Sequence, residues 1–111
     1  MRRATVEDFD RILDELRELH LRKSKDYGSS TDPYANVRHA AELFRLPAWV
    51  SALIRASDKI ARLAQFAQRG WLANESAEDS LMDLAVYAII ALLLYREANE
   101  NLPMHEDAND A

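Results

Sequence analysis

Cysteine is absent from this sequence, and glycine and proline are scarce, with two and three occurrences in 111 residues. The absence of cysteine excludes a disulfide framework, a thiolate zinc site and a cysteine nucleophile, and it fits a protein of the reducing cytoplasm. The scarcity of glycine and proline argues against the turn-rich pattern of a small all-β fold. We therefore expect a cytoplasmic, all-α protein.

A long apolar run and an excess of positive charge are also missing. The longest apolar run, residues 84–95, is shorter than the ~20 residues that a membrane-spanning helix needs. The formal net charge is −5, whereas binding to duplex nucleic acid relies on basic side chains that neutralise phosphates. These absences predict a protein that neither crosses a membrane nor binds duplex nucleic acid.

What is present is the composition of a single globular domain, with 49% apolar and 30% charged residues. We expect this domain to cover residues 1–103, followed by an acidic, flexible tail at 104–111. Helical spacing of apolar residues predicts a four-helix-bundle-like fold. The expected helices are residues 5 to about 25, 32–44, 47–69, and 74 or 76 to about 99.

Residue types at the helix ends support these bounds. Thr5 with Asp8 resembles a capping box, and Ser76 with Asp79 repeats the pattern. Gly70 stands where a helix end favours glycine. The last helix is apolar around nearly its whole circumference, so it has to be covered on all sides. Three other short helices can hardly do this, and we expect a homodimer or a homotetramer.

Three acids of the last helix, Glu75, Asp79 and Asp83, are spaced by four residues and therefore share one face. Stacked carboxylates supply the oxygen ligands that Mg²⁺ prefers. The alternative is a set of solvated acids that favour a helix start, and it suits Glu75 best. It suits Asp83 poorly, because an acid beside the apolar segment needs a cationic partner or a metal.

The third helix carries Asp58, Lys59 and Arg62 within two turns. In a functional interpretation Asp58 joins the metal site, while Lys59 and Arg62 meet phosphate oxygens, to which arginine binds in bidentate fashion. In the alternative interpretation the same residues form an intramolecular salt-bridge network.

A third patch combines Lys25, Asp26 and Tyr27 with Asn36. Lys25 offers a positive charge, Tyr27 a ring that could stack on a base, and Asn36 an amide for a base or sugar. The alternative is that these residues only terminate a helix.

Three segments recur in the same order in small phage-associated proteins that carry nucleotide-modification-associated domains. They are Lys25-Asp26-Tyr27-Gly28 with Asn36, residues 53–63 (LIRASDKIARL) and residues 75–88 (ESAEDSLMDLAVYA). Through them the chain resembles, over about residues 20–95, the MazG-like all-α nucleoside triphosphate pyrophosphohydrolases. The most specific part combines Asp-Lys-x-x-Arg-Leu with Asp-x-x-x-Asp-Leu-Ala-x-Tyr.

The resemblance implies a dimeric or tetrameric enzyme that uses Mg²⁺ or Mn²⁺ to cleave a (d)NTP or a modified nucleotide to monophosphate and pyrophosphate. Asp83 matches the acid that closes the family's Glu-x-x-Asp motif, while Ser80 stands in place of its first acid, next to Asp79. The preceding Glu-Glu-x-x-Glu motif is represented by Asp58. Residues 14–18 (DELRE) are a second candidate for it, ranked lower because charges on an amphipathic helix usually face solvent.

The leading hypothesis is thus a Mg²⁺-dependent nucleotide pyrophosphohydrolase. Its expected site consists of catalytic acids, metal ligands and substrate-binding residues: Asp58, Asp79 and Asp83, with Glu75 as a further metal ligand, and Lys25, Asp26, Tyr27, Asn36, Lys59 and Arg62 for the nucleotide. Two alternatives stay open. One is a non-catalytic nucleotide-binding or regulatory bundle, and the other is a helical oligomerisation module.

Overall fold

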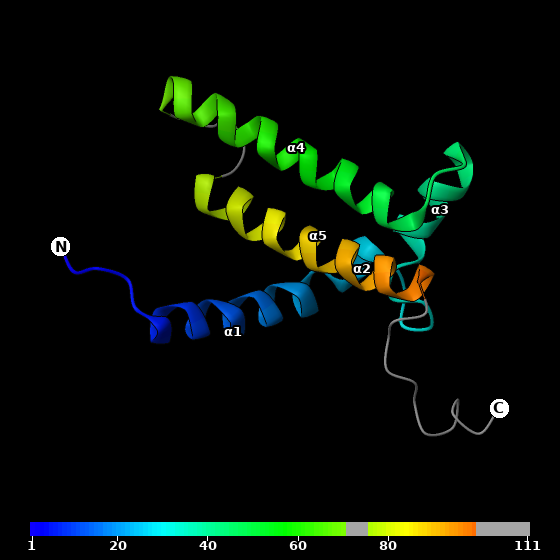
Figure 1. The fold of residues 1–111 in the computed structure, drawn as a ribbon, viewed down its shortest axis with the longest axis horizontal. Helices are drawn as coiled ribbons and strands as arrows, with labels where there is room; N and C mark the ends of the chain where they lie inside the picture. Colours follow the sequence, from blue (N-terminus) through cyan, green and yellow to red (C-terminus); the bar gives the residue numbers. More distant parts are fainter. Residues whose placement is uncertain (71–75, 100–111) are drawn as a thin grey trace.

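The computed structural model describes residues 1–70 and 76–99, which fold into five helices (Figure 1). They are α1 (Val6–Arg22), α2 (Ser24–Tyr27), α3 (Ala35–Phe44), α4 (Ala48–Arg69) and α5 (Ala77–Ala98). These two ranges contain no strand, so the predicted all-α class is confirmed. No helix within them is long and apolar enough to cross a membrane. The expected acidic tail at 104–111 lies outside the described residues.

Local capping groups fix the ends of three helices, as the sequence predicted. At the start of α1 the backbone N–H of Thr5 donates to Asp8 (2.8 Å) and that of Asp8 donates to the Thr5 hydroxyl (3.3 Å), which completes a capping box. Ser76 accepts from the Asp79 N–H (3.0 Å) at the start of α5. Gly70 ends α4 with a φ of 80°, a left-handed conformation that favours glycine.

Two predicted helix bounds were wrong. The first helix breaks at Lys23, whose φ of −97° and ψ of 14° leave the helical region, and the separate turn α2 follows it. The helix expected from Asp32 begins at Ala35, because Asp32 organises a turn instead. Its carbonyl oxygen accepts from the N–H groups of Ser29 (2.8 Å) and Ala35 (3.2 Å), and its carboxylate accepts from that of Tyr34 (3.3 Å).

Helices α4 and α5 lie side by side and antiparallel, and they share the most extensive contact in the structure (Figure 1). The buried residues of α4 are small: Ser51, Ala52 and Ala56. Small side chains allow two helices to approach closely, so this face packs on α5. Larger apolar residues of α4, including Ile54 and Ile60, remain exposed.

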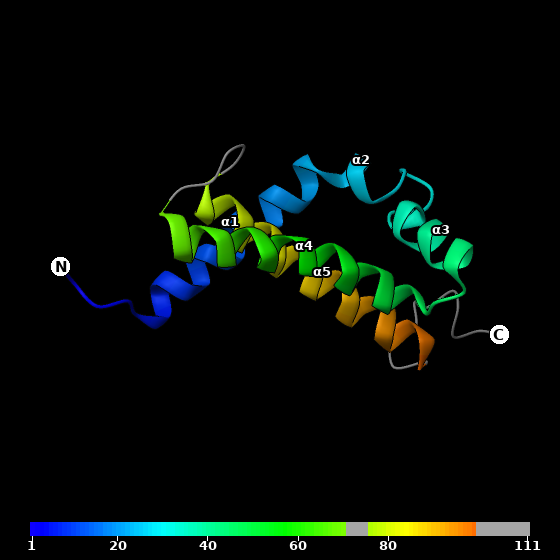
Figure 2. The same ribbon diagram turned by 90° about the horizontal axis from the view of Figure 1, so that it is seen from above.

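Helix α5 is central, because α4 covers one of its sides and α1 crosses another (Figures 1 and 2). It contributes the largest set of buried residues, which are Ser80, Asp83, Val86, Tyr87, Ile90, Ala91 and Leu94. Near its far end Trp49 of α4 packs edge-on against Tyr95, with ring centroids 5.6 Å apart. The other tryptophan, Trp71, lies outside the described residues.

Helix α1 buries little of its apolar stripe. Leu16 is its one buried residue, whereas Val6, Phe9, Ile12 and Leu13 are exposed. On α5, large apolar side chains are exposed as well, among them Leu81, Ile89 and Leu92. The single chain therefore leaves parts of two helices uncovered.

Candidate functional site

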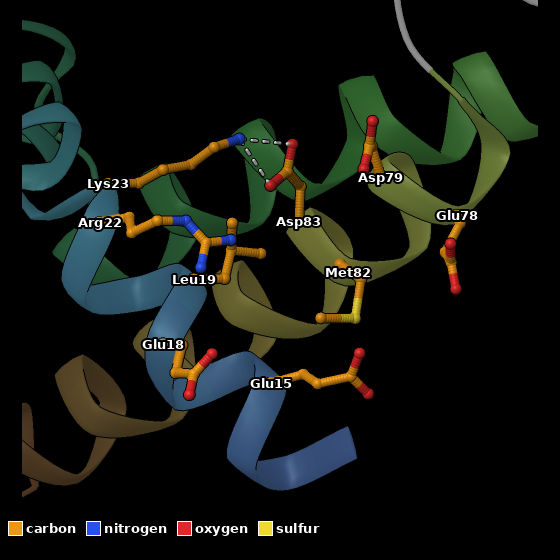
Figure 3. A pocket seen from close by; sticks show the side chains of 9 residues that line it. All are labelled: Glu15, Glu18, Leu19, Arg22, Lys23, Glu78, Asp79, Met82 and Asp83. Atoms are coloured by element: carbon orange, nitrogen blue, oxygen red, sulfur yellow. Dashed lines mark hydrogen bonds and ion pairs between the residues drawn. The ribbon is translucent and has the colours of Figure 1, made fainter. Parts of the chain in front are cut away.

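A cavity of about 470 Å³ lies between α1 and the first half of α5 (Figure 3). We call it the acid cavity, because five of its nine lining residues carry carboxylates. Its lining consists of Glu15, Glu18, Leu19, Arg22 and Lys23 from α1 and its end, and Glu78, Asp79, Met82 and Asp83 from α5. Acids of two separate helices and two basic side chains thus share one solvent-accessible space.

Asp83 lies at the inner wall of the acid cavity and is only 3% exposed. The Lys23 ammonium donates to both of its carboxylate oxygens, at 3.0 and 3.3 Å. The Lys59 ammonium of α4 lies 3.0 Å from Asp83 Oδ2. Burial by itself would raise the pKa of Asp83, but the hydrogen bonds and charges of the two lysines outweigh it, and the pKa stays below its ordinary value. Asp83 is therefore a buried, charged carboxylate.

The expectation that Asp83 requires a cationic partner or a metal is met by the two lysines. Lys59, for which phosphate binding and an intramolecular salt bridge were both considered, forms an ion pair with Asp83. Lys23 received no specific role in the sequence interpretation. The one indication in the sequence is the position of Lys23 at the end of a helix whose acidic residues lie beside its apolar face.

Asp79 lies one turn before Asp83, and both carboxylates project from the same face of α5 (Figure 3). This is the arrangement that the four-residue spacing predicted for the acid column. Glu78 also lines the acid cavity, while Glu75, the first member of the predicted column, lies outside the described residues.

The acids that share the cavity with Asp79 and Asp83 come from α1, not from α4. Glu15 and Glu18 line it, whereas Asp58 is an exposed residue of α4 that does not. The sequence had favoured Asp58 over residues 14–18 as the partner of these acids. Glu15 and Glu18 are exposed, as expected for charges on an amphipathic helix, and they border the cavity next to Leu19, which packs against the core.

The donor set of the acid cavity suits a hard divalent cation. Within residues 1–70 and 76–99 no three acidic or histidine side chains are gathered closely enough to hold an ion as they stand. Mg²⁺ does not need such a cage, because it usually takes one or two carboxylates and completes its shell with water and substrate phosphates. Such a cation would take its one or two carboxylate ligands from Asp79 and Asp83 of α5 or Glu15 and Glu18 of α1.

Tyr27 and Asn36 have structural roles that differ from the expected contacts with a base. Tyr27 is 2% exposed, its ring stacks on His20 (centroids 5.5 Å apart) and it meets Tyr87 edge-on (5.6 Å). Asn36 donates its side-chain N–H groups to the carbonyl oxygens of Lys25 (3.3 Å) and Asp26 (3.1 Å), which closes the end of α2. The Tyr27 ring is thus already enclosed within the protein.

The remaining predicted nucleotide contacts are surface residues. Lys25 and Asp26 are exposed on α2, and Arg62 is exposed on α4. None of these three side chains lines the acid cavity.

A second, apolar cavity of about 390 Å³ lies between α1 and the later part of α5. Its polar lining residues include His20 and Tyr34, whose ring nitrogen and hydroxyl oxygen are 3.1 Å apart. His20 thereby links α1 to the turn before α3.

Comparison with known proteins identified no match: no protein-family model, no curated protein and no solved structure is similar to this chain.

Proposed function

We propose that the protein is a Mg²⁺-dependent nucleotide pyrophosphohydrolase that converts a (d)NTP or a modified nucleotide to its monophosphate and pyrophosphate. The observation that carries this proposal is the acid cavity, in which Glu15 and Glu18 of α1 share one space with Asp79 and Asp83 of α5. The resemblance of residues 53–63 and 75–88 to MazG-like segments supports it further.

The reaction consumes one water molecule. Its oxygen attacks the α-phosphorus, the anhydride bond to the β-phosphate breaks, and pyrophosphate leaves while a proton is released. A bound divalent cation would neutralise charge on the phosphates and assist formation of the nucleophile. One or two of Glu15, Glu18, Asp79 and Asp83 would hold the cation, and a carboxylate that is left uncoordinated can accept the proton of the attacking water.

The basic residues at the same cavity suit the other side of the reaction. Arg22 and Lys23 extend from the end of α1 toward α5 (Figure 3). Guanidinium and ammonium groups beside a metal site bind phosphate oxygens and offset the charge that the leaving pyrophosphate acquires. A cavity lined by both carboxylates and basic side chains suits a metal–polyphosphate complex better than it suits the metal ion alone or the polyphosphate alone.

One observation favours a second candidate, a bundle that binds nucleotides without hydrolysing them. Asp83, the most buried carboxylate of the acid cavity, already forms ion pairs with Lys23 and Lys59. If both lysines stay paired with Asp83, the remaining acids would bind Mg²⁺ weakly. The protein would then bind phosphate groups without hydrolysing the nucleotide.

We also propose that a second copy of the chain covers the exposed apolar residues of α1 and α5. Val6, Phe9 and Ile12 form a stripe that water would otherwise solvate, and Ile89 and Leu92 are exposed in the same way on α5. Contiguous apolar surface of this kind usually marks an interface. A homodimer would bury it.

The test of catalysis is a panel of NTPs and dNTPs incubated with Mg²⁺ or Mn²⁺, with pyrophosphate and nucleoside monophosphate quantified together. We expect equimolar release of both products from at least one nucleotide. Asp79→Asn and Glu18→Gln should reduce kcat by about a hundredfold, because each removes one charged ligand from the acid cavity. Asp58→Asn is the matched control, since it removes an exposed acid outside the cavity, and it should retain activity.

If calorimetry detects nucleotide binding but no products form, the protein is a nucleotide-binding bundle and not an enzyme. Loss of activity in Asp58→Asn but not in Glu18→Gln would move the first acidic motif to α4. If the protein neither binds nucleotides nor forms products, the helical oligomerisation module is the remaining hypothesis.

A further inference from the structure

Two lysines hold the same buried carboxylate from different helices. Lys59 approaches Asp83 Oδ2 (3.0 Å) from the middle of α4, and Lys23 approaches Oδ1 (3.0 Å) from the junction of α1 and α2. Their side chains differ in exposure, at 18% for Lys59 and 40% for Lys23. Only Lys23 also lines the acid cavity. The two ion pairs are therefore unequal.

The position of Lys23 in the chain allows its ammonium to move. The residue lies at the break after α1, where its backbone has left helical geometry, and its long side chain reaches Asp83 along the cavity wall (Figure 3). Its side chain is 40% exposed, so water reaches the Lys23 ammonium more readily than it reaches the Lys59 ammonium, and Lys23 is the partner that can leave Asp83. Lys59 is enclosed between α4 and α5, so its pair with Asp83 is the more permanent one.

We propose that Lys23 is an exchangeable partner of Asp83, which pairs with this carboxylate in the empty site and transfers to phosphate oxygens when a nucleotide enters with its divalent cation. This inference rests on the function proposed above and adds to it the exchange of Lys23 between Asp83 and phosphate. A cation at Asp83 and the Lys23 ammonium seek the same oxygens, so one has to leave when the other binds. The displaced ammonium remains at the cavity, beside the anion.

A thermodynamic consequence follows from this exchange. A cation alone has to displace Lys23 without compensation, whereas a cation with a polyphosphate gives the displaced ammonium a new partner. The two ligands should therefore raise each other's affinity by the same factor. Lys23 would act as the element that couples them.

Arg22 provides a matched control within the same cavity. It carries the same charge one residue earlier and lines the acid cavity. Among the described contacts it has no hydrogen bond or ion pair with Asp83. Removing the Arg22 charge changes the local potential without freeing Asp83, so the comparison separates exchange from general electrostatics.

The experiment measures Mn²⁺ binding by electron paramagnetic resonance, with and without inorganic pyrophosphate, for the wild type, Lys23→Met and Arg22→Met. We expect Lys23→Met to bind Mn²⁺ alone about fivefold more tightly than Arg22→Met does. We also expect pyrophosphate to tighten Mn²⁺ binding in the wild type, and this gain to fall by a similar factor in Lys23→Met. In wild-type protein, the ¹⁵N signal of the Lys23 ammonium should move when Mg²⁺ and pyrophosphate are added, while that of Lys59 stays in place.

The possible failures are distinguishable. If Mn²⁺ binds but Lys23→Met equals Arg22→Met and the Lys23 signal does not move, the exchange is overturned and the proposed metal site stands. If Mn²⁺ does not bind the wild type under either condition, the proposed function fails together with the exchange. The ammonium signals are read in the wild type, so the test holds even if Lys23→Met does not fold.

Discussion

The Lys59 ammonium lies 3.0 Å from the Asp83 carboxylate and joins α4 to α5 inside the protein. Asp83 is nearly inaccessible, so its charge depends on this contact and on the second lysine at the cavity wall. The Lys59–Asp83 pair contributes to the packing of α4 on α5, and Asp83 also lines the acid cavity. Stability and site chemistry are therefore coupled through one carboxylate.

Lys59→Met should destabilise the protein by about 2 kcal/mol, because it leaves the buried Asp83 charge with one partner instead of two. Asp58→Asn, which changes the exposed neighbour of Lys59, should alter the free energy of unfolding by less than about 0.5 kcal/mol. Urea denaturation followed by circular dichroism measures both values. Equal stability of the two variants would show that the Lys59–Asp83 pair contributes nothing to the fold.

Acid should destabilise the protein through Asp83. Because its folded pKa lies below the value of about 3.9 for an unfolded aspartate, its ionised form stabilises the fold above that pH. This contribution is lost as pH falls through the lower folded pKa. Urea denaturation from pH 6 to pH 2 should show a steeper decline for the wild type than for Asp83→Asn. Parallel curves would contradict the lowered pKa.

Gly28→Ala should cost more stability than Gly70→Ala. A Cβ at position 28 would collide with the backbone of Asp32 and Pro33, so the turn before α3 would have to move. At Gly70 there is open space, and only the left-handed φ of 80° opposes alanine, by about 1 kcal/mol. Thermal unfolding of the two variants decides the order, and a smaller loss for Gly28→Ala would mean that the turn adapts without cost.

The exposed stripe of α1 should control self-association. Phe9→Glu with Ile12→Glu places charge on the stripe and should shift light scattering from a dimer to a monomer. Glu7→Gln with Asp10→Asn changes the same helix at exposed polar positions and should leave the dimer intact. A wild-type monomer at all concentrations would contradict the proposed interface.

The sequence predicted the helix ends best where one side chain decides them. Thr5 with Asp8, Ser76 and Gly70 act within a few residues, and each begins or ends a helix as expected. The break at Lys23 was missed, because nothing in its local sequence demands it. There the side chain is engaged by Asp83, which is distant in the chain.

The candidate site was predictable in part for the same reason. Asp79 and Asp83 share a helix, so their spacing placed them on one face. Their companions Glu15 and Glu18 depend on how α1 crosses α5, which periodicity does not specify. Tyr27 looked available for a base because its motif reads as a loop, yet the packing of α1 and α5 encloses it.

The most direct test of the central claim is Mn²⁺ binding measured by electron paramagnetic resonance in the presence of pyrophosphate, for Glu15→Gln with Glu18→Gln against Glu7→Gln with Asp10→Asn. Both double variants remove the same charge from α1, but only the first removes lining residues of the acid cavity. We predict that Mn²⁺ binding weakens at least about tenfold in the first and stays at the wild-type level in the second. Equal affinity of the two variants would contradict a metal site between α1 and α5.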